Sequence, residues 1–160
     1  MFRKTLPALS IFFLAIGTFA QTKSYHSPNK KVRALVVAVG ARGYETHESR
    51  LDIRSSSGAL LRSKSFRSRD HNHGEGIDHA EWTTDGRFFV FNTGSSGGHQ
   101  PWHVSTYVYD ARTNKLYSLD SIVGSITSDF DLRGSTLMTT RMGTTADEKV
   151  PVTIRLARLR

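Results

Sequence analysis

The sequence predicts an all-β protein, built as an antiparallel meander of about 8–10 strands. Three observations lead to this prediction. After position 21 the apolar residues follow period two, and no segment carries a sustained i, i+3, i+4, i+7 apolar stripe. β-Branched and aromatic runs recur, separated by Gly, Asn, Asp and Ser. The chain has no cysteine, so packing rather than disulfide bonds must hold its sheets together.

Residues 1–20 have the features of a cleaved export signal. Arg3 and Lys4 precede an apolar run that ends in Thr18-Phe19-Ala20. An uncut membrane anchor is the weaker alternative, because about 15 residues rise only about 22 Å and the hydrocarbon core is about 30 Å thick. We therefore expect a signal peptide at 1–20 and a single all-β domain at 21–160 that is periplasmic or secreted and at most peripheral to the membrane.

The charge of the chain limits its partners. The sequence has 22 Lys and Arg against 14 Asp and Glu, and removing Arg3 and Lys4 leaves 20 − 14 = +6. An exported basic protein meets envelope proteins and anionic envelope polymers, so nucleic acid is not the expected partner. Six basic residues lie within residues 50–69, and Arg62 and Lys64 share one face of a strand. A solvated face that protects an edge strand is favoured over an anion site.

The first expected strands lie before residue 67. Residues 32–39 form an almost continuous apolar run, which is typical of an inner strand. Residues 51–54 alternate between apolar and polar, and the turn Ser55-Ser56-Ser57-Gly58 then leads into a strand over 60–66. The first half of the domain is therefore expected to be a meander.

Hairpins dominate the second half. Asp85-Gly86 favours a tight turn, because both central residues of such turns often need positive φ. Arg112-Thr113-Asn114 and Arg133-Gly134 are the next expected turns. The corresponding strands are expected at 77–82, 87–92, 106–110, 115–120, 130–141 and 150–159.

The strands form an internal repeat. Ser27-Pro28-Asn29-Lys30 corresponds to Thr84-Asp85-Gly86-Arg87, 57 residues later, and each is followed by an apolar run. A weaker third copy begins at Arg133 and ends within 152–159. Such spacing suits one four-stranded antiparallel unit for each repeat.

The hairpin motif resembles a known repeat. Residues 81–91 (EWTTDGRFFVF), together with 107–110 (YVYD) and 115–119 (KLYSL), are similar to one blade of the TolB-type β-propeller repeat. Residues 27–66 match this pattern less closely. Thr83-Thr84 replaces the Ser-Pro of the family, and three units are fewer than the four to eight blades that close a propeller. The resemblance implies an envelope protein that binds partners, folded as a partial propeller, an oligomer that completes a ring, or a sheet sandwich.

Histidines gather in two segments that are expected to be loops. Five of the seven histidines of the chain fall between residues 71 and 103. His-x-His in extended chain directs both imidazoles to one side, which suits Zn²⁺. Asp78 or Glu75 would add an oxygen ligand or orient a histidine. No His-Glu-x-x-His motif occurs, and satisfied loop histidines are the favoured alternative. The residues of the predicted metal site are His71, His73, Asp78, His79 and His103.

A glycine-rich loop precedes Trp102. In one interpretation Gly97, Gly98, His99 and Trp102 contact a ligand or partner. In the other, which the sequence favours, Pro101-Trp102 holds the loop against its own sheet and Trp102 covers the end of the core. No phosphate-binding loop and no nucleophile elbow is present in the sequence.

Three functions remain open. The first is an exported binding or interaction protein without catalytic activity, which the sequence favours over an enzyme. The second is a metal-binding protein or metal-dependent hydrolase that uses the histidine cluster. The third is an inhibitor of a cell-envelope hydrolase, with the loop at 94–98 as a plug.

Overall fold

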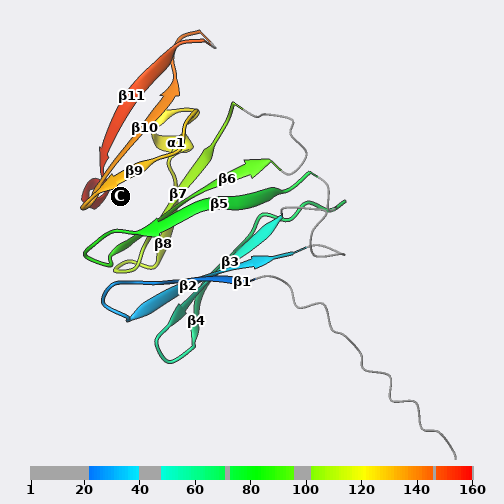
Figure 1. The fold of residues 1–160 in the computed structure, drawn as a ribbon, viewed down its shortest axis with the longest axis vertical. Coiled ribbons are helices and arrows are strands. Elements are labelled where there is room, and N and C mark those ends of the chain that lie inside the picture. Colours follow the sequence, from blue (N-terminus) through cyan, green and yellow to red (C-terminus); the bar gives the residue numbers. More distant parts are fainter. Residues whose placement is uncertain (1–21, 40–47, 71–72, 96–101, 146, 160) are drawn as a thin grey trace, which may run out of the picture.

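The structure is a computed structural model that describes residues 22–39, 48–70, 73–95, 102–145 and 147–159. Its strands form three antiparallel sheets (Figure 1). The first sheet contains β1 (Thr22–His26), β2 (Val32–Ala38), β3 (Ser49–Ser55) and β4 (Leu60–Ser65). The second contains β5 (Glu75–Trp82), β6 (Phe88–Ser95), β7 (Ser105–Asp110) and β8 (Lys115–Ser118). The third contains β9 (Asp131–Arg133), β10 (Thr136–Met142) and β11 (Lys149–Arg155), and the helices are α1 (Asp120–Val123) and η1 (Leu156–Arg158).

The second sheet lies between the other two, and both of its faces are buried. Successive residues of β6 point to opposite faces, because side chains alternate along a strand. Phe89 and Phe91 pack in a core shared with the first sheet, where they meet Ile53. Phe88 and Val90 pack in a second core against the third sheet. This explains why β6 reads as a continuous apolar run rather than an alternating one.

The predicted fold class is confirmed. Each sheet is a meander of consecutive antiparallel strands, and none of the three closes on itself, so the described residues form an all-β partial propeller. Two of the strands expected from the sequence end earlier in the structure. The chain leaves β8 after Ser118 for α1, and it leaves β11 after Arg155 for η1.

The sequence interpretation missed β1. Of its five residues only Tyr25 is partly buried, so the segment has no apolar alternation that would mark a strand. It forms a strand because all of its residues pair with β2, from Thr22 opposite Val37 to His26 opposite Arg33. Partner strands rather than local pattern determine this element.

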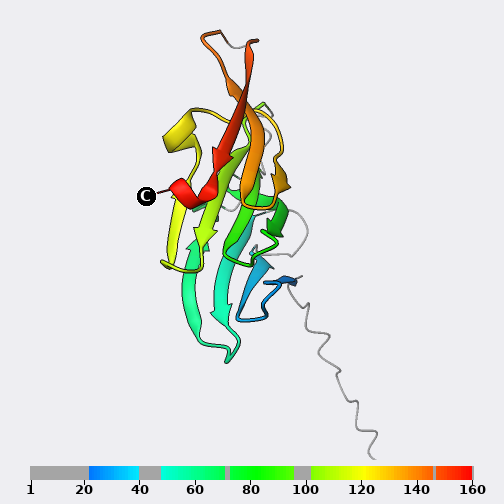
Figure 2. The ribbon, with the colours of Figure 1, turned by 90° about the vertical axis from the view of Figure 1, so that its left-hand side faces the viewer.

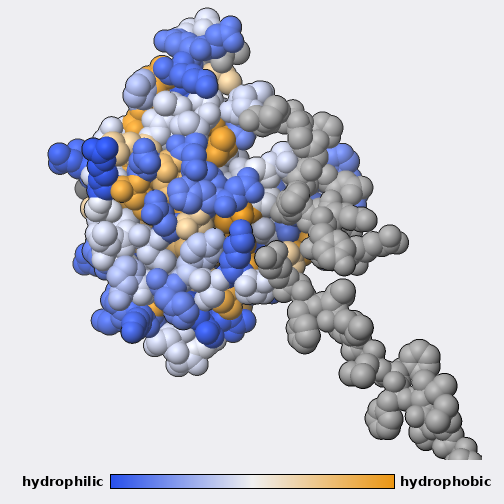
Figure 3. Space-filling model, viewed as in Figure 1, coloured by the Kyte–Doolittle hydropathy of each residue, from blue (hydrophilic) through white to orange (hydrophobic). Residues whose placement is uncertain are grey.

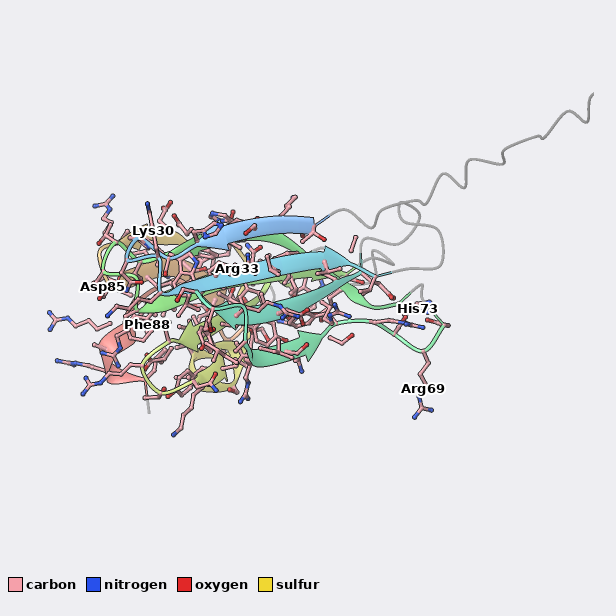
Figure 4. The ribbon with its side chains drawn as sticks, turned by 90° about the horizontal axis from the view of Figure 1, so that it is seen from below. Lys30, Arg33, Arg69, His73, Asp85 and Phe88 are labelled. Carbon is pink, nitrogen blue, oxygen red and sulfur yellow. The ribbon has the colours of Figure 1, made fainter. Side chains whose placement is uncertain are left out.

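The sheets have two distinct ends. Their tight turns lie at one end, which we call the turn end, where Lys30 and Asp85 are found (Figure 4). The opposite end, which we call the loop end, carries the longer connections and includes His73. Within the described residues, no helix is long and apolar enough to cross a membrane.

Candidate binding surface

The described residues of the predicted site fall into two groups. His73, Trp102 and His103 lie in connections at the loop end, whereas Asp78 and His79 lie within β5 of the second sheet. Glu75, the first residue of β5, pairs with Ser95, the last residue of β6. The connection before β5 and the connection after β6 therefore leave the same end of the sheet, as the sequence predicted. His71, Gly97, Gly98 and His99 lie outside the described residues.

Each described histidine of the predicted metal site has its own carboxylate partner. His73 Nδ1 contacts Asp70 Oδ2. His79 Nδ1 lies 2.8 Å from Asp129 Oδ1, and His103 Nε2 lies 2.7 Å from Asp120 Oδ1. Over the part of the chain that the structure describes, no three His, Asp or Glu side chains are grouped to hold a metal ion. Because His71 is outside that part, the zinc site remains a prediction.

Asp120 fixes the base of the loop end. Its Oδ1 accepts hydrogen bonds from His103 and from the backbone N–H of Ile126, and its Oδ2 accepts one from the N–H of Thr106. The carboxylate thus ties three segments together: the start of β7, the chain before β9, and α1, of which it is the first residue. Charge-assisted bonds of this kind hold their partners more firmly than neutral ones.

Trp102 precedes His103 in the chain, and its side chain is exposed. The residue is 48% exposed, and its ring centroid lies 5.7 Å from that of His103. The expectation that Trp102 covers the core was therefore wrong. Trp102 belongs to neither of the two core clusters of the described residues.

A second polar cluster joins the second sheet to the third. Asp129 Oδ1 accepts hydrogen bonds from His79, from Asn92 Nδ2 and from the backbone N–H of Phe130. The His79 ring stacks on Phe130 with 4.4 Å between centroids. Asn92 is buried, and its Oδ1 accepts a hydrogen bond from the backbone N–H of His79. His79 lies where the register between β5 and β6 shifts. These contacts give His79 a structural role between sheets.

Asp120 and Asp129 were not identified from the sequence. Neither lies in a histidine-rich segment, and Asp129 is 50 residues from its partner His79. The packing of the third sheet on the second brings Asp129 to His79, whereas the antiparallel pairing of β7 with β8 brings Asp120 to His103. Asp78, the remaining predicted ligand, is exposed on β5, and its carboxylate lies against Gly94 of β6.

The basic segment within residues 50–69 is not one cluster. Arg50 is paired with Asp52 at 3.0 Å. Arg62 and Lys64 share a face as predicted, because they stand opposite Ile53 and Leu51. Arg62 Nη1 donates to the Asn114 carbonyl, and the Lys64 ammonium lies 5.7 Å from the centre of the Phe66 ring. These cations are distributed over several contacts.

No protein-family model and no curated protein matches this chain. Among solved structures it resembles the β-propeller domain of the Trilobed protease from Pyrococcus furiosus, with 12% identity, 85% of this chain and 38% of that chain covered, and a TM-score of 0.49. It also resembles a protein described as a conserved lipoprotein from Clostridium novyi NT (14% identity, 90% of each chain, TM-score 0.49). A third is TolB from Acinetobacter baumannii (9% identity, 89% of this chain and 31% of that chain, TM-score 0.43). The chain thus resembles β-propellers, as its hairpin motif predicted.

Proposed function

We propose that this chain is an exported, non-catalytic binding protein of the cell envelope, and that its contact surface is the loop end around Trp102. The observation that carries the proposal is the exposed Trp102 side chain on the base that His103 and Asp120 form. An exposed tryptophan offers a large apolar contact area, and tryptophan is enriched among the residues that dominate binding energies.

The export signature at 1–20 supports the location of this function. An exported protein with a net charge of +6 meets envelope proteins and anionic envelope polymers, and these are the partners we propose. The glycines and His99, which the sequence predicts as further contacts, adjoin Trp102 in the chain.

The test is affinity capture from an envelope extract with the mature protein and its Trp102→Ala variant. Partners identified by mass spectrometry are then purified, and their Kd for both forms is measured by calorimetry. We expect at least a 10-fold weaker Kd for the variant, with an unchanged melting temperature.

Leu60→Ala is a matched control, because Leu60 is 53% exposed but lies in β4 of the first sheet. Equal affinity of wild type and Trp102→Ala for every purified partner would refute the proposal. Loss of folding in Trp102→Ala would instead assign the indole a structural role.

A further inference from the structure

In the part of the chain that the structure describes, the third sheet ends in a strand whose outer edge has no partner strand. The first two sheets have four strands each, whereas in the described residues the third has the order β11-β10-β9, with β11 outermost. β11 lies on the outside of the molecule, with α1 and η1 to one side of it (Figure 2). An open strand edge is a template for an added strand.

Hydrogen bonds show which backbone groups of β11 face outward. The N–H of Leu156 donates to the Ser135 carbonyl, and the N–H of Gly143 donates to the Glu148 carbonyl. In an antiparallel ladder such pairs recur every second residue, so Val150, Val152 and Ile154 pair with β10. The backbone groups of Lys149, Pro151, Thr153 and Arg155 therefore point to the free edge, where Thr153 and Arg155 offer N–H donors and Pro151 does not.

An apolar groove runs beside this edge. Its volume is about 540 Å³, and it is open to solvent. Figure 3 shows apolar surface beside strongly hydrophilic residues on the side of the molecule that carries β11 and η1. The groove is lined by Ile122, Val123, Val152, Thr153, Ile154, Arg155, Arg158 and Leu159. Side chains at every second position of an added strand would enter it, next to Val152 and Ile154.

The positive charges on and beside β11 indicate what kind of added strand the edge would bind. Lys149 and Arg155 stand at positions of β11 that alternate with Val152 and Ile154, and Arg155 and Arg158 also line the groove. None of the described residues that line the groove is acidic. A second copy of β11 would bring the same cations together, and Pro151 would interrupt the shared edge.

We propose that β11 and this groove bind an extended acidic peptide segment of a partner protein, which joins the third sheet as a fourth strand. Its apolar side chains fill the groove, and the acidic side chains between them face Arg155 and Lys149. Backbone hydrogen bonds supply affinity, and this alternation of acidic and apolar residues supplies specificity. The site is distinct from the proposed Trp102 surface.

The probe is the fluorescent peptide acetyl-TVEVDVS-amide, measured by fluorescence polarisation with the mature protein. We expect a Kd below about 1 mM, as a small interface of one strand allows. We expect at least 10-fold weaker binding of the counterpart TVKVKVS and of a scrambled peptide of the same composition. Binding by none of the peptides at 1 mM, or equal binding of acidic and basic forms, would overturn the proposal.

Variants identify the site. Thr153→Pro removes an outward N–H, and Arg155→Glu with Arg158→Glu reverses the charge; each should weaken binding at least 10-fold. Arg112→Glu, in the exposed turn after β7, is the matched charge control and should leave Kd unchanged. Trp102→Ala should also bind normally, which separates this site from the proposed function.

Backbone pairing is tested without any variant. Peptides N-methylated at alternate residues should lose binding in one methylation pattern and retain it in the other, because only one edge of the added strand faces β11. Equal binding of both patterns would contradict strand addition. Sedimentation that shows a dimer with Thr153 protected from amide exchange would assign the edge to a second copy instead.

Discussion

Ser27 and Thr83 occupy the same position in the first hairpin turns of two successive sheets. The hydroxyl of Ser27 donates to Asn29 Oδ1 and accepts from the N–H of Val32. The hydroxyl of Thr83 donates to Asp85 Oδ1 and accepts from the N–H of Phe88. The repeat spacing is therefore 83 − 27 = 56 residues, and the expected alignment of Ser27 with Thr84 at 57 residues was wrong by one position.

This equivalence predicts equal consequences for the two turns. Ser27→Ala and Thr83→Ala each remove a buried hydroxyl that binds both ends of its turn, so we expect each to lower the free energy of unfolding by about 1–2 kcal/mol. Urea denaturation measures the change. Thr153→Ala, at an exposed position of β11, is the control and should change it by less than about 0.5 kcal/mol. A large effect at Thr83 with none at Ser27 would refute the equivalence.

Gly86 has a second requirement beyond its φ of 68°. A Cβ atom there would lie 2.9 Å from Asn29 Nδ2, and Asn29 is held by its bonds to Ser27 and Lys31. Gly134 has a similar φ of 60°, but a Cβ atom there would meet nothing within 4 Å.

We therefore expect Gly134→Ala to cost about 1–2 kcal/mol of unfolding free energy from backbone strain alone. Gly86→Ala should cost about 1 kcal/mol more, because it also displaces Asn29. Thermal and urea unfolding of both variants measure the difference. If Gly86→Ala and Gly134→Ala lower the free energy of unfolding equally, the displacement of Asn29 adds no cost to Gly86→Ala.

Two aspartates make folding sensitive to acid. The Thr83 hydrogen bond, reinforced by Arg87 and Ser135, holds the pKa of Asp85 below its usual value. Burial raises the pKa of Asp110, but hydrogen bonds from Arg87 and Arg112 outweigh this effect and lower it. Arg87 binds Asp110 through two bonds, of 3.2 and 2.9 Å.

Because both pKa values are lower in the folded state, the stabilisation is complete above the unfolded-state pKa of about 3.9 and is lost as pH falls below it. Urea unfolding at several pH values from 6 to 2.5 should show this loss. Asp85→Asn should have a shallower dependence than wild type, whereas Thr153→Ala, at an exposed position of β11, should follow wild type. Parallel curves for wild type and Asp85→Asn would contradict the assignment.

Metal content is the remaining prediction. His73, His79 and His103 each contact a different aspartate, so we expect purified mature protein to hold well below one zinc ion per chain. Elemental analysis after dialysis against zinc measures the content. One zinc ion per chain that is lost in both His71→Ala and His73→Ala would instead support the predicted site.

Local pattern in the sequence was sufficient for the individual hairpins. Asp85-Gly86 predicted a turn at this place, although only Gly86 has the positive φ that was expected of both residues. The apolar run over 88–91 predicted a buried strand. The same local pattern was insufficient for β1, whose residues are mostly exposed and become a strand only by pairing with β2.

The sequence by itself determined the strand class and the repeat, because these depend on neighbours along the chain. Tertiary structure alone decided that Asp129 meets His79, that Trp102 faces solvent and that β11 has an open edge. Each of these depends on how separate meanders pack, and residues 50 positions apart carry no local signal of their contact.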